Sequence, residues 1–332
     1  MAEHDPEPVV VPDEYATDHD SSLGDDAASS TQSISSSILS YRQENGRTYH
    51  RYKDGKYYLP NDETENDRLD LQHNLFLLTY NDQLGLAPPN DPKSKDNRVL
   101  DVGTGTGIWV IDYADEHPQA EVIGVDLSPI QPSFVPPNAR FEIDDIDEEW
   151  NYSEPFDYIH SRMMNSSIAD WEVYFQKMYS NLVPGGYVEV QEIEVPLKSD
   201  DETLKKDHQL FKWCQLLREG TMKLQRPFES FDAIKKAMAK AGFIEIVDTR
   251  FKWPTNCWPK DRKYKELGAW NNKNTLQALE ALTLAPFTRV HGWTKDEVHV
   301  FLPGVRRDLN DQNIHAYWPI CSIYGMKPKD GL

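Results

Sequence analysis

Cysteine is scarce in this chain, and long apolar runs are missing from it. Only Cys214, Cys257 and Cys321 occur among 332 residues, and no two of them form a C-x-x-C pair. An odd number of widely spaced cysteines argues against a disulfide framework and against a zinc site. No apolar run reaches the roughly eighteen residues of a membrane span, and the amino terminus lacks the features of a signal peptide. We expect an intracellular protein without a membrane span.

Positive charge is the second deficit. The chain has 35 Lys and Arg against 55 Asp and Glu, a net charge of −20. In residues 1–40 nine side chains are acidic, none is Lys or Arg, and Ser29–Ser40 is rich in serine. Such a segment buries too little apolar surface to order itself, so we predict a disordered acidic tail over 1–40. The remainder stays acidic and repels phosphates, so direct binding of nucleic acid is not expected.

A glycine-rich turn is the most informative feature present. Residues 98–102 are an apolar run containing Asp101, and Gly103, Gly105 and Gly107 follow at alternate positions. The pattern predicts a strand that turns sharply into a helix. A second short apolar run ends in Asp126, which places a carboxylate at the tip of the neighbouring strand, where ribose hydroxyls can reach it. The pair indicates a nucleoside site; the alternative is a tight turn with no ligand.

The spacing of the glycines narrows the choice of nucleoside. A dinucleotide fingerprint needs its third glycine at position 108, where Ile108 stands, and no Lys-Ser/Thr pair follows as in a triphosphate loop. Asp101 brings negative charge beside the turn, which suits an ammonium better than a pyrophosphate. S-adenosylmethionine, with a ribose, an ammonium and a sulfonium, fits this pattern. An NAD-dependent dehydrogenase is kept as an alternative.

Strand-like and helical runs alternate after the tail, which predicts an α/β fold with a doubly wound, mostly parallel sheet. The expected strands are 98–102, 121–126, 140–144, 156–160, 186–193, Phe243–Val247 and Ala316–Tyr324. The expected helices are 66–84, packed beside the glycine turn, 107–116, 170–182, 202–225 and 229–241, the last capped by Gly242. The basic and aromatic segment 41–60 either lies over a ligand or forms a surface hairpin around Asp54-Gly55.

An insert at 252–300 is too long for a simple connection. It contains Trp253, Trp258, Trp270 and Trp293, and we expect it to form a helical lid over the substrate. The alternative is that these tryptophans belong to the core.

Five segments together carry a family resemblance: Asn45–His50, Tyr57–Glu63, Arg68–His73, Leu100–Trp109 and Phe156–Arg162. Over residues 41–327 the chain resembles the class I S-adenosylmethionine-dependent methyltransferases, and more narrowly the fungal LaeA-like group. The resemblance implies a seven-stranded sheet with an antiparallel last strand, and methyl transfer by in-line displacement to a secondary metabolite or a protein. It also implies a cytoplasmic or nuclear location and a velvet-type or zinc-finger partner. The alternative is a cofactor-binding regulatory subunit with little or no transfer activity.

The same resemblance assigns cofactor contacts by position. Gly103, Gly105 and Gly107 would approach the methionine part, with Asp101 near its ammonium, and Asp126 would accept from the ribose. Asp145 would face the adenine amino group, with Asp144 as a neighbour able to exchange roles with it. The remaining cofactor residues are Thr104, Leu127, Ile146 and His160. The alternative for Asp144, Asp145 and Asp147 is a solvated acidic loop.

Residues 160–162 end a predicted strand at the edge where this fold places substrate-facing groups. His160 suits removal of a proton from an oxygen or nitrogen acceptor, and its alternative is a structural histidine. Arg162 binds an acidic substrate group or closes a salt bridge. Glu189, Glu192 and Glu194 either face the site or are solvated at the sheet edge. No metal ligands and no covalent intermediate are expected.

Overall fold

The structure is a computed structural model that describes residues 41–44, 46–50, 52 and 58–329. The tail expected over 1–40 and the hairpin expected at Asp54-Gly55 lie outside these residues, so both stay predictions. A two-stranded hairpin opens the described part: β1 (Arg42–Glu44) pairs antiparallel with β2 (Arg47–Tyr49) across Gly46.

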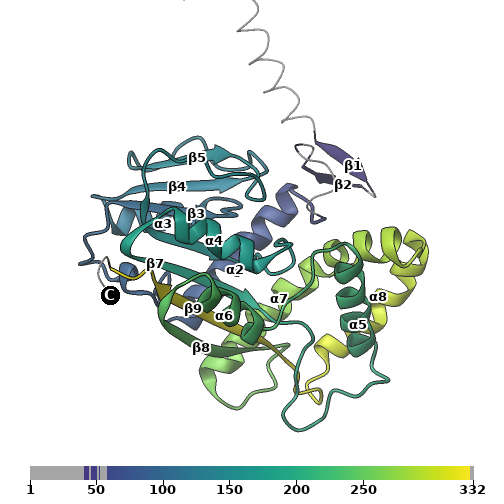
Figure 1. The fold of residues 1–332 in the computed structure, drawn as a ribbon. Coiled ribbons are helices and arrows are strands. Elements are labelled where there is room, and N and C mark those ends of the chain that lie inside the picture. Colours follow the sequence, from purple (N-terminus) through teal and green to yellow (C-terminus); the bar gives the residue numbers. More distant parts are fainter. Residues whose placement is uncertain (1–40, 45, 51, 53–57, 330–332) are drawn as a thin grey trace, which may run out of the picture. The chain divides into compact units, whose positions relative to one another are not determined.

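A seven-stranded sheet forms the centre of the molecule, in the order β5-β4-β3-β6-β7-β9-β8 (Figure 1). All pairs are parallel except those of β9, which runs antiparallel to both neighbours. The doubly wound sheet and its antiparallel last strand are therefore confirmed. The strands are β3 (Arg98–Val102), β4 (Glu121–Asp126), β5 (Ala139–Ile143), β6 (Phe156–Arg162), β7 (Leu182–Ile193), β8 (Ile244–Pro254) and β9 (Tyr317–Met326).

The strand order reverses beside β3. The chain runs outward from β3 through β4 to β5 and then returns to β6 on the other side of β3. Connections on opposite sides of the sheet leave a crevice at the carboxyl ends of these strands, which is where open α/β sheets bind ligands.

Helices cover both faces of the sheet. On one face α3 (Ile108–Glu116) buries Trp109 and Tyr113 against β3, β4 and β6. On the other face α4 (Trp171–Ser180) and α6 (Phe231–Lys240) pack in a second core. Gly242 follows α6 with a φ of 105°, which confirms the predicted glycine cap.

A helical cap gathers at one end of the sheet (Figure 1). It is built from α2 (Glu63–Thr79), α5 (Gln209–Lys223), α7 (Arg262–Ala285), η2 (Pro286–Val290) and α8 (Lys295–Asn310), with the short η1 (Pro88–Asn90) after α2. The insert between β8 and β9 is thus helical, as expected. Among the described helices, none combines the length and apolar character needed to cross a membrane.

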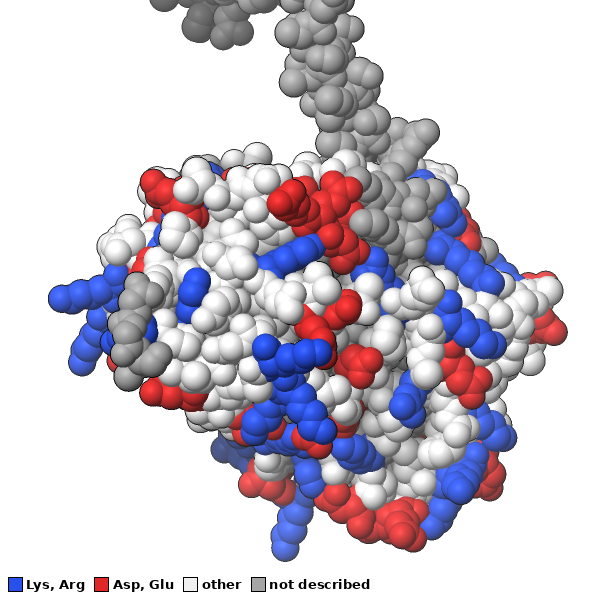
Figure 2. Space-filling view, in the orientation of Figure 1, with Lys and Arg blue, Asp and Glu red and all other residues white. Residues whose placement is uncertain are grey.

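Charges of both signs are interspersed over the face shown in Figure 2. Lys240 of α6, for example, pairs with Glu172 of α4, and both side chains are exposed. Pairs of this exposed kind contribute little to stability.

Glu189 is a buried hub of hydrogen bonds in the middle of β7. Its carboxylate accepts from the backbone of Leu86 and Ala87 at 2.9 Å, from the Tyr158 hydroxyl at 2.9 Å and from the Ser322 hydroxyl at 2.6 Å. These donors come from the loop after α2 and from the two strands that flank β7. Glu189 therefore neither faces the site nor lies in solvent; it ties the loop to the sheet.

Replacing Glu189 by Gln should lower the free energy of unfolding by about 3 kcal/mol, because an amide N–H₂ would face donors that now bind a carboxylate. Urea unfolding followed by circular dichroism measures this change. Glu149→Gln, which removes one exposed carboxylate, is the control and should shift the midpoint little. Equal midpoints for the two variants would contradict the role assigned to Glu189.

Candidate functional site

The glycine turn connects β3 to α3 at the crevice. Gly103, Gly105 and Gly107 have φ values of 75°, 56° and 80°, a region that side-chain-bearing residues rarely adopt. A Cβ at Gly105 would meet only Leu69 within 4 Å, so this part of the turn leaves room for a ligand. A Cβ at Gly107 would lie 2.3 Å from the Phe141 ring. Gly107 thus serves packing and the start of α3, and it does not border the cavity.

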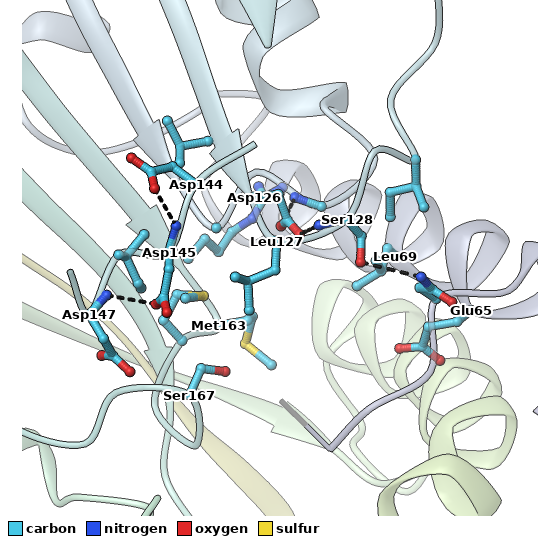
Figure 3. A pocket seen from close by; sticks show the side chains of 18 of the residues that line it. Glu65, Leu69, Asp126, Leu127, Ser128, Asp144, Asp145, Asp147, Met163 and Ser167 are labelled. Atoms are coloured by element: carbon cyan, nitrogen blue, oxygen red, sulfur yellow. Dashed lines mark hydrogen bonds between the residues drawn. The ribbon is translucent and has the colours of Figure 1, made fainter. Parts of the chain in front are cut away.

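A cavity with about 910 Å³ of empty space, partly open to solvent, lies at the carboxyl ends of β3 to β6. Figure 3 shows Asp144 and Asp145 on one side of it and Glu65 and Leu69 of α2 on the other. It brings together seven of the predicted cofactor residues: Gly103, Gly105, Asp126, Leu127, Asp144, Asp145 and Ile146. We call it the cofactor cavity.

Asp126 at the end of β4 is held in place by backbone donors. Its Oδ2 accepts from the Gly105 N–H at 2.9 Å, and its Oδ1 accepts from the Ser128 N–H at 3.0 Å. Burial raises the pKa of this carboxyl above its ordinary value, and the two hydrogen bonds oppose that shift. Each oxygen retains a lone pair for a further donor, which is what two ribose hydroxyls require.

The acidic loop after β5 is ordered rather than simply solvated. The Asp145 side chain is buried, and its Oδ1 accepts from the Asp147 N–H at 3.0 Å. Asp144 is exposed, and its Oδ1 accepts from the Asp145 N–H at 2.7 Å. Asp147 pairs with Arg226 at 2.6 Å. All three residues border the cavity, and of the three only Asp145 is buried.

A smaller recess continues from the cofactor cavity toward α2. Asp101, Gly103, Thr104 and Gly105 line it, and Arg162 lies in its wall. The Arg162 guanidinium contacts His73 Nδ1 at 3.1 Å and lies over the Phe76 ring at 5.0 Å, and burial lowers its pKa. No carboxylate of the described residues is within ion-pair distance of it. The recess thus holds a carboxylate and a guanidinium that forms no ion pair with the described residues, and we call it the charged recess.

Met163 follows Arg162 with a φ of 58°, a strained value for a non-glycine residue. This breaks the alternation of β6, and both side chains border the charged recess. The next residues are held by Glu192, whose carboxylate accepts from the N–H groups of Met164 and Asn165 at 2.9 and 3.0 Å. Burial raises the pKa of Glu192 to about 8. Glu192 therefore shapes the site through the loop it anchors.

His160 does not lie where a general base is needed. Its side chain is fully buried, its Nδ1 is 2.7 Å from Asp101 Oδ1, and its ring stacks on Trp109 with centroids 3.9 Å apart. It borders neither the cofactor cavity nor the charged recess. The geometry corrects the prediction of a catalytic or cofactor contact and favours the structural alternative. The prediction treated residues 160–162 together as the strand end. His160 lies two residues before that end, paired in register with Asp101, whereas Arg162 is the last residue of β6 and borders the site.

The four tryptophans predicted over the substrate do not cover it. Trp253 is fully buried in the core, and Trp270 is 44% exposed. None of the four borders the cofactor cavity or the charged recess. The core alternative holds for Trp253. The sequence of a long insert does not show which side chains of its helices pack against the rest of the protein.

Helix α2 supplies residues that the sequence reasoning did not assign. Glu65, Leu69 and Gln72 are spaced along one face of this helix and border the cavities described above. The Thr106 hydroxyl donates to Asp70 at 2.7 Å, so the predicted packing of this helix beside the glycine turn is confirmed. The helical spacing of Glu65, Leu69 and Gln72 was the signal in the sequence that could have placed them on one face of α2.

Comparisons with known proteins agree with this geometry. Residues 71–247 match the model of a family described as methyltransferase domain. The chain is 42% identical over 304 residues to methyltransferase pytC of Aspergillus terreus, covering 91% of this chain and 93% of the relative. It is 43% identical over 279 residues to secondary metabolism regulator LAE1 of Cochliobolus heterostrophus, covering 82% and 91%.

A solved structure shares the fold. Phosphoethanolamine N-methyltransferase 2 of Haemonchus contortus, determined with phosphomonomethylethanolamine and S-adenosylhomocysteine, matches with a TM-score of 0.50 at 17% identity, over 92% of this chain and 74% of that one. The sequence relatives show the family as well as the fold. The chain belongs to the S-adenosylmethionine-dependent methyltransferases, within the LaeA-like group.

Proposed function

We propose that this enzyme binds S-adenosylmethionine along the crevice, with the methionine end in the charged recess and the nucleoside in the cofactor cavity. The observation that carries the placement is the charged recess itself. Asp101 and Arg162 line one small space, and an α-amino acid presents an ammonium and a carboxylate together. A dinucleotide has no ammonium and carboxylate on one carbon, so the recess disfavours the dehydrogenase alternative.

The nucleoside contacts follow from the remaining geometry. Asp126 would receive the ribose hydroxyls, and the buried Asp145 would receive the adenine amino group. The open turn at Gly105 leaves space for a ligand to approach the backbone. When bound, the cofactor supplies a methyl group activated on a sulfonium. The residues of the chain orient the partners and exclude water, which is the main demand of an in-line displacement.

A protein partner is supported by a different observation. The relative LAE1 is named a secondary metabolism regulator. On this ground, and on the resemblance to the LaeA-like group, we infer that a velvet-type or zinc-finger protein binds this chain. We infer also that the chain works in the cytoplasm, the nucleus or both, and that regulation accompanies methyl transfer.

Asp126→Ala should weaken binding of S-adenosylhomocysteine about 100-fold, because two hydrogen bonds to a charged group are lost. Isothermal titration calorimetry on the full chain measures the affinity. The exposed Asp115 on α3 gives the control Asp115→Asn, for which no change is expected. An unchanged affinity in Asp126→Ala would show that the ribose lies elsewhere.

The raised pKa of Asp126 adds a pH signature to the same measurement. The ionised carboxylate accepts the hydroxyls, so affinity is full above the pKa of Asp126 and falls as the pH drops through it. Because that pKa lies above the ordinary 3.8, the fall begins at a higher pH than for an unperturbed aspartate. Asp126→Ala should lose this part of the pH dependence.

With Arg162→Met, the protein should no longer distinguish a cofactor that has its carboxylate from one that lacks it. The wild type is expected to bind decarboxylated S-adenosylmethionine about 30-fold more weakly than S-adenosylmethionine, whereas the variant should bind the two alike. Competition against radiolabelled cofactor measures both affinities. Arg140→Met, at an arginine on β5 that is 44% exposed, should keep the wild-type preference. A preference retained in Arg162→Met would exclude the proposed contact.

The inferred partnership predicts that the purified chain forms a complex with a velvet-type protein from a fungal host. Size-exclusion chromatography of the two purified proteins tests it, and a fluorescent fusion locates the chain in the cell. A variant lacking residues 1–40 shows whether the acidic tail contributes. Separate elution at micromolar concentration, with the zinc-finger candidates eluting separately as well, would contradict the partnership.

A further inference from the structure

A second cavity, with about 820 Å³ of space partly open to solvent, adjoins the cofactor cavity along α2. Its apolar wall includes Trp213 and Leu217 of α5, Phe228, Val195 and Trp318. All of these except Phe228 are buried, so the wall belongs to the interior of the helical cap. We call this the apolar cavity.

The apolar cavity meets both parts of the cofactor site. Glu65, Leu69 and Met163 border it and the cofactor cavity, while Leu69, Gln72 and Met163 border it and the charged recess. Figure 3 shows Glu65, Leu69 and Met163 at the edge of the cofactor cavity. A group placed in the apolar cavity therefore reaches the cofactor site past one face of α2.

Polar side chains also line this cavity, and one buried cluster of them is charged. The uncharged polar residues outside that cluster are Gln72, Asn165, Ser166, Asn271 and Thr275. Arg68 donates through Nε and Nη2 to Glu65 Oε1, at 3.0 and 2.7 Å, and through Nη1 to Asn274 Oδ1 at 2.8 Å. All three side chains are buried. Arg68 thus compensates the charge of Glu65, while Glu65 Oε2 accepts no hydrogen bond from the described residues. The carboxylate keeps acceptor capacity where the cavities meet.

The chemistry of the wall selects a class of ligand. Indole, phenyl and aliphatic side chains favour flat apolar groups, and α7 contributes the small Ala278 and Ala281, which leave space. A peptide would have to leave backbone amides unpaired against the aromatic and aliphatic part of this wall, at a cost. The Glu65 oxygen that accepts no hydrogen bond from the described residues suits one hydroxyl or amine on an otherwise apolar molecule.

We propose that the apolar cavity is the methyl-acceptor site, that it takes a compact aromatic or polycyclic molecule bearing one hydroxyl or amine, and that Glu65 is the proton acceptor. This rests on the cofactor placement proposed above. As the oxygen–carbon or nitrogen–carbon bond forms, the S–CH₃ bond breaks and its electron pair stays on sulfur. The proton of the acceptor's hydroxyl or amine passes to Glu65 Oε2, which later releases it to water.

The test uses the full chain with 2-naphthol and 2-naphthylamine as probes and naphthalene as the probe without a polar group. Calorimetry on protein saturated with S-adenosylhomocysteine measures probe affinity, and transfer of radiolabelled methyl measures turnover. Binding of 2-naphthol or 2-naphthylamine more tightly than naphthalene, with methylation of at least one of the two, is the expected result.

Glu65→Gln keeps the size of the side chain and its bond to Arg68 but removes the base. Turnover should fall about 100-fold or more, with the affinities for S-adenosylhomocysteine and the probe retained. Glu63→Gln, an exposed neutralisation in the same first turn of α2, is the matched control and should keep wild-type turnover. Equal turnover in Glu65→Gln and the wild type would overturn the role of Glu65.

Ala278→Met fills the apolar cavity from α7. It should weaken probe binding about tenfold while S-adenosylhomocysteine binds as in the wild type. Normal cofactor binding shows that the variant is folded, so unchanged probe binding would overturn the site.

The two proposals fail in different ways. If Asp126→Ala and Arg162→Met do not change cofactor binding as predicted, the proposed placement of the cofactor is itself overturned. If the cofactor binds as proposed, but no probe binds, or a lysine peptide is methylated and the probes are not, the acceptor proposal alone is overturned. In the latter case the acceptor is a protein.

Discussion

A buried hydrogen bond between Asp101 and His160 joins the two halves of the sheet where the strand order reverses. The two residues are register partners on β3 and β6, and Trp109 of α3 stacks on the histidine ring. The end of β3 leads into the glycine turn, and the end of β6 leads into Arg162 and Met163. Because this contact fixes the two strand ends together, it also fixes the opposed charges of the recess.

The same contact explains why one histidine could be misassigned. His160 has the chemistry of a base, but its partner Asp101 and the stacked indole use that chemistry inside the sheet. One of the two Asp101 oxygens is thereby occupied, and the other has no hydrogen-bond partner among the described residues. His160 thus orients the Asp101 carboxylate at the site and does not itself border the cavity.

Local sequence patterns were sufficient for the sheet and its glycine turn. Strands such as Arg98–Val102 and Glu121–Asp126 are buried on both faces, so their apolar runs stand out, and their carboxyl ends must meet at one edge. Asp126 was therefore placed at the cavity from local sequence, whereas Asp145 was placed there by the family resemblance. Trp213 and Trp318 meet only through tertiary packing of the helical cap, which no local period encodes. The pairing of Glu65 with Asn274, through Arg68, has the same long-range origin.

The match to the methyltransferase-domain family begins at residue 71, inside α2, and ends at residue 247, inside β8. Glu65, Arg68, Asn274, Ala278 and Trp318 all lie outside it. The helices α7 and α8 connect β8 to β9, two strands that are neighbours and antiparallel at one edge of the sheet. A connection of this kind changes length and sequence without altering strand order or the crevice at β3. Descendants of one ancestor can therefore keep a common methyl donor while exchanging the molecule they modify, a route to chemical diversification within a single scaffold.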